Sequence, residues 1–200
     1  MPKVVDHAAR RAELTEALWR VALRDGFDAV TVRSVAQEAG WSPGALRHYF
    51  PDKAEMVLFA MDLVAQESAT RIQTVYAGLE KVTPEAIQEH LEQFLPLDGP
   101  RRVESEVWFA LVALAHTDDR VAARRTQIDD MIRGSVQSVV LALGEIGRLG
   151  KGREEAVETM RLHALLDGLV IQLMAEPPRL SPQEARAVVG RHLTDLAAVS

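Results

Sequence analysis

The stretch TVRSVAQEAGWSPGALRHYFPDK, residues 31–53, contains two short helical patterns separated by a glycine. In the first pattern, apolar residues recur at three- and four-residue spacing after Thr31, a suitable N-cap, which predicts a helix with one buried face. Gly40 ends this helix, because only glycine enters the left-handed conformation at little cost. Ser42 and Pro43 then begin a second helix as its N-cap and first residue. Two helices joined by so short a turn indicate a helix-turn-helix that presents the second helix to DNA.

The second helix carries the side chains that we expect to contact DNA. Leu46 falls on its inward face, whereas Arg47 and His48 point outward. Arginine can donate two hydrogen bonds to a guanine edge, and histidine can contact a base or a phosphate; the alternative is that both contact phosphates alone. Tyr49 either binds a phosphate or belongs to the core. For Thr31, Arg33 and Lys53 the alternative is a solvated surface residue. The expected DNA contacts are Thr31, Arg33, Ser42, Pro43, Gly44, Ala45, Arg47, His48, Tyr49 and Lys53.

The residues around this motif extend it into a family resemblance. Counted from Val32, the fifth position is a small residue and the ninth is Gly40, and positions four, eight, ten, fifteen and eighteen are apolar. The motif is preceded by GFDAVTVRSVA (residues 26–36), ends in LRHYFPDKAEM (residues 46–56) and is followed by a long helical remainder. With these features the chain resembles the TetR family of transcriptional regulators.

The resemblance implies an all-α fold of two parts. Residues 1–52 would form a three-helix, helix-turn-helix DNA-binding domain, and residues 53–200 a larger helical ligand-binding and dimerisation domain. The C-terminal part, above all residues 165–185, resembles the choline-responsive BetI-type subgroup. Arg47 stands where the family most often has tyrosine, a departure that we expect to change base preference but not the fold.

The charge of the chain is unevenly distributed. A net charge of −6 argues, taken alone, against nucleic-acid binding. Residues 1–53 nevertheless carry a net +1, which leaves −7 on the remainder. Because an acidic body is repelled by DNA and a near-neutral head with local cations is not, this distribution orients the molecule head-first.

Composition limits the remaining possibilities. With 48% hydrophobic and 5% aromatic residues, the chain suits an aliphatic, helix-rich core. The absence of cysteine excludes disulfides, thiolate zinc sites and a cysteine nucleophile. No apolar run approaches the roughly 18–20 residues of a membrane span, and no secretory signal pattern is present, so we expect a cytoplasmic protein without membrane contact.

Hydrophobic spacing predicts about nine helices and no strand. The breaks between them are marked by glycine and proline, and a flexible loop is expected at residues 144–152. Besides the helix-turn-helix, the expected helices span approximately residues 6–24, 53–78, 84–95, 102–116, 119–145, 153–175 and 181–199.

The last two predicted helices have wide apolar faces that suit a dimer. One recognition helix reads too few bases, so two must be held in successive major-groove faces by a homodimer. In the resembled family, the last two helices of each subunit form a four-helix dimer interface; the alternative is that these faces only complete the monomer core. The expected interface residues are Leu162, Leu166, Leu169, Val170, Leu173, Val189, Leu193 and Leu196.

The middle helices mix aromatic, sulfur and polar residues among aliphatics, as around a small-molecule pocket; the alternative is plain core. A quaternary ammonium ligand of the BetI type would need an aromatic cage, to which Trp108, Phe109, Tyr76 and Phe94 could contribute. The expected pocket residues are Phe94, Trp108, Phe109, His116, Met131, His163 and Gln172.

Enzyme signatures are weak. His163 and Asp167 lie four residues apart, as metal ligands can, but no third ligand follows at a suitable spacing. No nucleophile elbow is present, and the loop at residues 144–152 lacks the glycine and hydroxyl positions of a phosphate-binding loop. We therefore expect no catalytic site, metal or cofactor.

The sequence hypothesis is a homodimeric regulator, a repressor released from a palindromic DNA operator by a small-molecule effector. The alternatives are an activator of the same fold and a helical ligand-binding protein without DNA activity.

Overall fold

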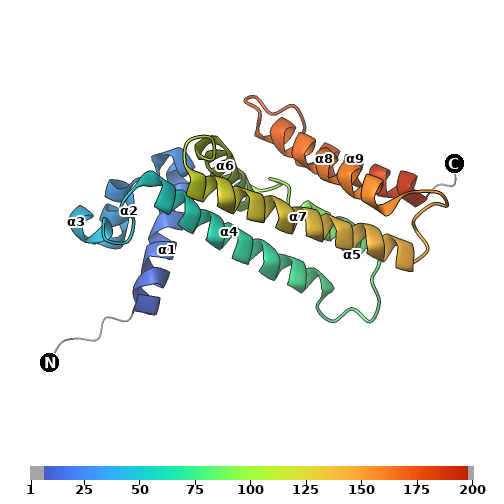
Figure 1. Cartoon of the computed structure of the whole chain (residues 1–200), viewed down its shortest axis with the longest axis horizontal. Helices are drawn as coiled ribbons and strands as arrows, with labels where there is room; N and C mark the ends of the chain where they lie inside the picture. Colours follow the sequence, from blue (N-terminus) through green and yellow to red (C-terminus); the bar gives the residue numbers. More distant parts are fainter. Residues whose placement is uncertain (1–6, 198–200) are drawn as a thin grey trace.

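The computed structural model describes residues 7–197, over which nine α-helices and one short 3-10 helix are joined by turns, without a strand in that range. The all-α prediction is therefore confirmed. The head comprises α1 (His7–Asp25), the 3-10 helix η1 (Phe27–Ala29), α2 (Val32–Ala39) and α3 (Pro43–Leu46). The molecule is elongated, with α3 at one tip and the turn between the two helices α7 and α8 at the opposite end (Figure 1).

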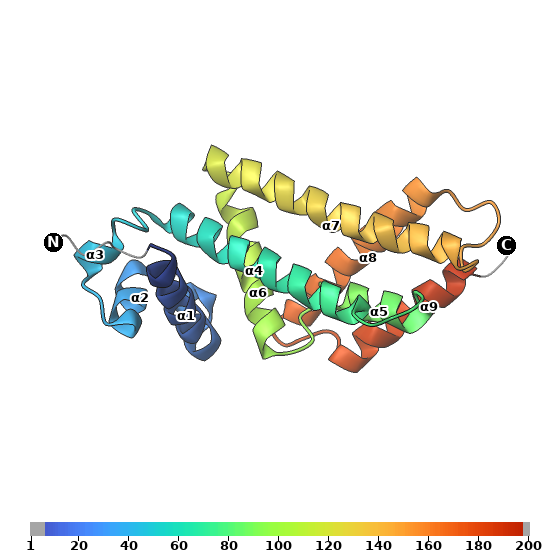
Figure 2. The ribbon, with the colours of Figure 1, turned by 90° about the horizontal axis from the view of Figure 1, so that it is seen from below.

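The body is built around two long helices that lie side by side, α4 and α7 (Figures 1 and 2). α4 leaves the head and runs into the body, α6 packs across it, and α8 and α9 form a pair on the far side of α7. The bounds of the body helices are α4 (Lys53–Tyr76), α5 (Pro84–Glu92), α6 (Gly99–Leu114), α7 (Asp119–Glu145), α8 (Glu155–Met174) and α9 (Pro182–Ala197).

Most helix ends fall within three residues of their predicted positions, and the start of α6 is one of the larger differences. It begins at Gly99 rather than near Arg102. Asp98 caps it by accepting a hydrogen bond from the Arg101 backbone N–H at 2.9 Å. Pro100 occupies the first turn, where a missing N–H costs nothing, so the proline that we expected to break the chain helps to start the helix.

Two groups of buried side chains form the core. The first includes Leu14, Leu18 and Leu46 of the head together with side chains of α4, α6 and the start of α7. The second joins α5, the remainder of α7, α8 and α9. The head therefore packs on α4 and α6 rather than standing free of the body. Within the described residues, no helix is long and apolar enough to cross a membrane.

The residues expected at a dimer interface occupy the second group instead. All but Val170 are buried within the protomer, and Val170 is half-buried. Within the protomer these side chains therefore belong to the core, and little of their surface is left for a partner. The buried set is Leu162, Leu166, Leu169, Leu173, Val189, Leu193 and Leu196.

Candidate nucleic-acid interface and ligand cavity

The turn between α2 and α3 has the local geometry that its residues predict. Thr31 and Ser34 form a reciprocal capping box at the start of α2. Gly40 ends the helix in the left-handed conformation, with φ of 71°. The backbone N–H of Trp41 then donates to the carbonyl of Ala36 at 2.8 Å, which closes the turn.

α3 is a single helical turn held by its neighbours. The Ser42 hydroxyl accepts a hydrogen bond from the Ala45 N–H at 3.2 Å, and Leu46 is buried in the head core. After α3, the N–H groups of Tyr49 and Phe50 both donate to the Leu46 carbonyl at 2.9 Å. Residues 47–49 thus continue as turns, and the predicted recognition helix is shorter than its sequence pattern suggested. Since one helical turn is unstable alone, these contacts fix its orientation.

Some cations of the head are tied to carboxylates. Nε of Arg20 lies 2.8 Å from one Glu38 oxygen, and Nη1 of Arg24 lies 2.9 Å from the other. Hydrogen bonds from Arg24 and Arg20 hold the pKa of Glu38 below its usual value. The charges of these two arginines are therefore already compensated within the head.

The basic side chains around α3, by contrast, are not paired with carboxylates of the described residues. Arg33, Arg47 and Lys53 are exposed, as is His48, and within residues 7–197 none of these four side chains has a hydrogen-bond or ion-pair partner. Tyr49 is half-buried because its ring packs edge-on against Trp41, with centroids 5.6 Å apart. The other expected DNA contacts, all exposed, are Thr31, Ser42, Pro43, Gly44 and Ala45. Unpaired cations beside an exposed helix N-terminus suit contact with phosphates and base edges.

Comparison with known proteins decides the family. The model of the tetR family of bacterial regulatory proteins matches residues 14–61, and that of the C-terminal part of BetI-type transcriptional repressors matches residues 84–198. The chain is 34% identical over 197 residues to the HTH-type transcriptional regulator PksA of Bacillus subtilis, covering 98% of this chain and 94% of that protein. The chain belongs to the TetR family. It is therefore related to transcriptional regulators with a helix-turn-helix DNA-binding domain.

Solved structures agree with this assignment. A transcriptional regulator from Rhodococcus sp. Rha1 superposes with a TM-score of 0.74 at 27% identity, covering 93% of this chain and 95% of that one. A regulator from Saccharomonospora viridis, solved in complex with choline, has a TM-score of 0.74 at 20% identity and covers 92% and 95% of the two chains. At that identity the second likeness concerns the fold alone.

Within the body of this TetR-family protein, a largely apolar cavity of about 430 Å³ lies among α4, α6, α7 and α8. Two of the expected pocket residues do not line it. His116 is exposed in the turn that follows α6, and Gln172 is exposed on α8, one residue beyond the lining Ile171. The expected residues that do line the cavity are Phe94, Trp108, Phe109, Met131 and His163.

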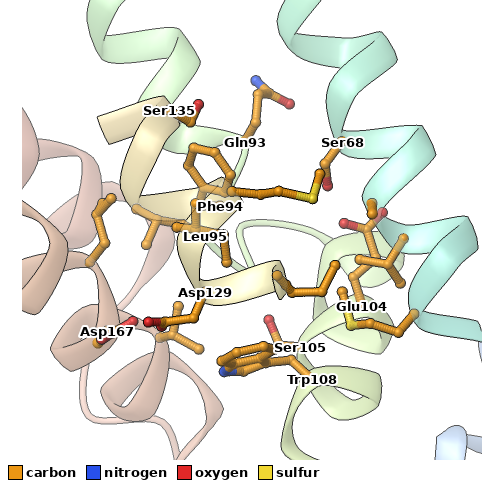
Figure 3. Close-up of a pocket in the computed structure, with 18 of the residues that line it drawn as sticks. Ser68, Gln93, Phe94, Leu95, Glu104, Ser105, Trp108, Asp129, Ser135 and Asp167 are labelled. Atoms are coloured by element: carbon orange, nitrogen blue, oxygen red, sulfur yellow. The ribbon is translucent and has the colours of Figure 1, made fainter. Parts of the chain in front are cut away.

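On one side of the cavity lies Glu104 (Figure 3), whose carboxylate is paired with Arg71. Glu104 of α6 accepts two hydrogen bonds from the guanidinium of Arg71 at 2.8 and 2.7 Å. Burial raises the pKa of Glu104, and Arg71 opposes this increase. Arg71 also donates to the side chain of Gln93 at 3.2 Å. This side is therefore polar without an unbalanced charge.

The other side carries carboxylates. Asp129 of α7 and Asp167 of α8 face one another close to Ser105 and Trp108 of α6 (Figure 3). The side chain of Asp167 is 64% exposed, so it lies at the mouth of the cavity. Its partial burial raises its pKa; His163, whose Nε2 lies 4.0 Å away, opposes this increase, and Asp129 adds to it. Asp129 has no hydrogen-bond or ion-pair partner within the described part of the chain.

Sequence reasoning missed these acids as lining residues. His163 is an expected pocket residue, but the sequence suggests Asp167 only as a possible metal ligand beside it; within residues 7–197 no group of three or more His, Cys, Asp or Glu is arranged to hold a metal. Asp129 lies two residues before Met131, so its place on a helix already assigned to the pocket was the available signal. Tyr76 does not line the cavity, and Phe94 stands apart from Trp108, so the expected aromatic cage is not formed (Figure 3).

Tyr76 is instead hydrogen bonded to a buried histidine. Its hydroxyl lies 2.9 Å from Nδ1 of His90, and Nε2 of His90 lies 2.7 Å from the hydroxyl of Ser135, which lines the cavity. Burial lowers the pKa of His90 to about 4. The neutral imidazole therefore links α4, α5 and α7 by donating one hydrogen bond and accepting the other.

Two polar contacts connect the body to the head. On α6, a Glu106 oxygen accepts a hydrogen bond from the Phe27 backbone N–H of η1 at 2.7 Å. At the start of α7, Arg120 contacts Asp52 at 3.1 Å and Glu55 at 2.8 Å, next to the entry into α4. Helices that line the cavity thus also touch the head.

Proposed function

We propose that this protein is a homodimeric repressor that acts in the cytoplasm and is released from a palindromic DNA operator by a small-molecule effector. Residues 1–52 bind DNA, and residues 53–200 bind the effector and the partner subunit. The observation that carries the proposal is the exposure of Arg33, Arg47 and Lys53 around α3, without partners within the described residues, while Arg20 and Arg24 are neutralised. Arg47 reads a base edge, and the other two cations bind phosphates.

The outer faces of α8 and α9 supply the dimer interface. Met160 and Ile171 on α8 are 51% and 62% exposed, and Val157 and Val188 are exposed as well; of these four, Ile171 also borders the cavity. The three α8 residues fall on one helical face, because they are spaced by three and eleven residues. Several exposed apolar side chains along one face of a helix support an association site. A two-fold dimer through this face would hold two copies of α3 for successive half-sites.

Effector binding changes the relative position of the heads through α6. This helix presents Ser105 and Trp108 to the cavity and holds η1 through Glu106. A ligand that favours one placement of α6 therefore favours one placement of the head. The required coupling is modest, about 1–3 kcal/mol or about 5- to 150-fold in operator affinity.

Enrichment of bound fragments from a genomic DNA pool tests this function. The expected result is one palindromic motif with half-sites about 10 base pairs apart, or a multiple of that spacing. Transcription in vitro from a promoter that contains this motif should fall when the protein is added. Recovery of fragments with no shared motif would contradict sequence-specific DNA binding, and increased transcription would contradict the repressor role.

A further inference from the structure

The cavity in the body has two chemically different sides joined by an apolar middle. Asp129 and the exposed Asp167 mark one side of the cavity, Glu104 marks the other, and Trp108 lines the same cavity (Figure 3). Glu104 is paired with Arg71. Aliphatic and aromatic side chains make up most of the wall between them. A ligand that fills this cavity must therefore be amphipathic.

The unpaired charge in the cavity is negative. Among the lining cations, Arg101 is held by Asp98, with nitrogen and oxygen 2.8 Å apart, and its side chain is only 14% exposed. Arg125 lies one turn before Asp129 on α7, is exposed, and forms no ion pair with it. Two carboxylates thus face one exposed guanidinium, with His163 as the other titratable neighbour. The two carboxylates therefore exceed the one guanidinium by one negative charge, which a bound monocation would neutralise.

We propose that the effector is an amphipathic organic monocation, whose charged group lies between Asp129 and Asp167 and whose apolar part extends along the cavity toward Phe94. The proposal rests on the effector role proposed above. Trp108 supports it independently of the carboxylates, since the face of an indole ring attracts a cation.

A small cation such as choline is a poor fit. The aromatic side chains that could enclose a trimethylammonium group are not gathered around one point, because Tyr76 bonds His90 and Phe94 stands away from Trp108. Choline would also leave most of the volume of about 430 Å³ unfilled. A longer cation buries more apolar surface, and its affinity increases accordingly.

The charge that the cavity prefers in a ligand is tested with three compounds that share the phenylbutyl group: phenylbutylamine, phenylbutanol and phenylbutyrate. Choline serves as the small cation. Titration calorimetry on the full-length protein without DNA should rank the amine first and the carboxylate last. In the double variant Asp129→Asn/Asp167→Asn the preference for the amine over the alcohol should fall about tenfold. Asp130→Asn is the matched control, because Asp130 is the next residue on α7, is exposed and does not line the cavity.

The outcomes separate this inference from the repressor function. Binding of the carboxylate or alcohol as tightly as the amine, tighter binding of choline, or no amine binding by a folded protein would each overturn it. An unchanged amine preference in the double variant would do the same. DNA binding is measured on separate samples, so a protein that binds its operator but prefers the anion refutes only the ligand class. A protein that binds the amine but no DNA would contradict only the proposed repressor function.

Discussion

The arginines of the head divide according to their partners. Arg20 and Arg24 share Glu38, whereas Arg47 is exposed and has no partner within residues 7–197. A charge count over the sequence treats the three alike. Glu38 lies 14 and 18 residues from the two arginines that it binds, so the sequence does not show these contacts. Only the folded structure distinguishes an arginine that is paired within the head from one that is available to DNA.

Protonation of His90 should destabilise the protein. The folded-state pKa of about 4 lies below the ordinary 6.5, so between these values the unfolded chain binds more protons. Stability should therefore fall as the pH is lowered from about 6.5 to about 4, by on the order of 1–3 kcal/mol, and this contribution should level off below pH 4. Urea unfolding at several pH values measures it.

The variant His90→Leu should have a flatter stability profile over that pH range than the wild type, whatever its stability at pH 7. His116→Gln is the matched control, because it removes an exposed imidazole without opening the core. An equally steep profile in His90→Leu would contradict the assignment to His90.

At the level of elements, the turn from α2 to α3 depends on the backbone of Gly40. Neither Gly40 nor Gly44 has a neighbour within 4 Å of an added Cβ, but only Gly40 has positive φ. Gly40→Ala should therefore cost about 1–2 kcal/mol of unfolding free energy. Gly44→Ala should leave it equal or higher, because alanine favours a helix. Equal stability losses in thermal unfolding of the two variants would contradict this.

Helix ends were predictable from sequence where the signal is local. Thr31, Gly40, Ser42 and Pro43 set the ends of α2 and α3 through caps within a few residues. Even the mistaken start of α6 had a local cause, an Asp98 cap before Pro100 that was interpreted as a break.

The buried face of α8 was not predictable in the same way. Apolar residues occur on both faces of this helix, among them buried Leu166 and exposed Ile171. Periodicity alone therefore does not identify the inner face. The proximity of Asp129 to Asp167 was not predictable for a similar reason, because it depends on how α7 packs against α8.

At the scale of the whole molecule, the outer face of α8 should control assembly. Met160→Glu or Val157→Glu places a charge in the proposed apolar interface, at positions that do not line the cavity, where an unpaired carboxylate is strongly unfavourable. Sedimentation velocity should detect a dimer for the wild type and a folded monomer for these variants. Leu23→Glu is the control, because Leu23 is 53% exposed in the head, away from α8. A dimer that survives both α8 substitutions would place the interface elsewhere.

The most direct test of the DNA-binding role is fluorescence anisotropy of the wild type, Arg47→Ala and Arg24→Ala on the recovered operator and a scrambled duplex. The wild type should prefer the operator, with an affinity that falls as salt rises. Arg47→Ala should lose about 1–3 kcal/mol of operator binding and much of that preference, while Arg24→Ala should retain both, because Glu38 and Asp25 neutralise Arg24. Equal wild-type affinity for both duplexes, or an unchanged operator preference in Arg47→Ala, would contradict the proposed role of α3.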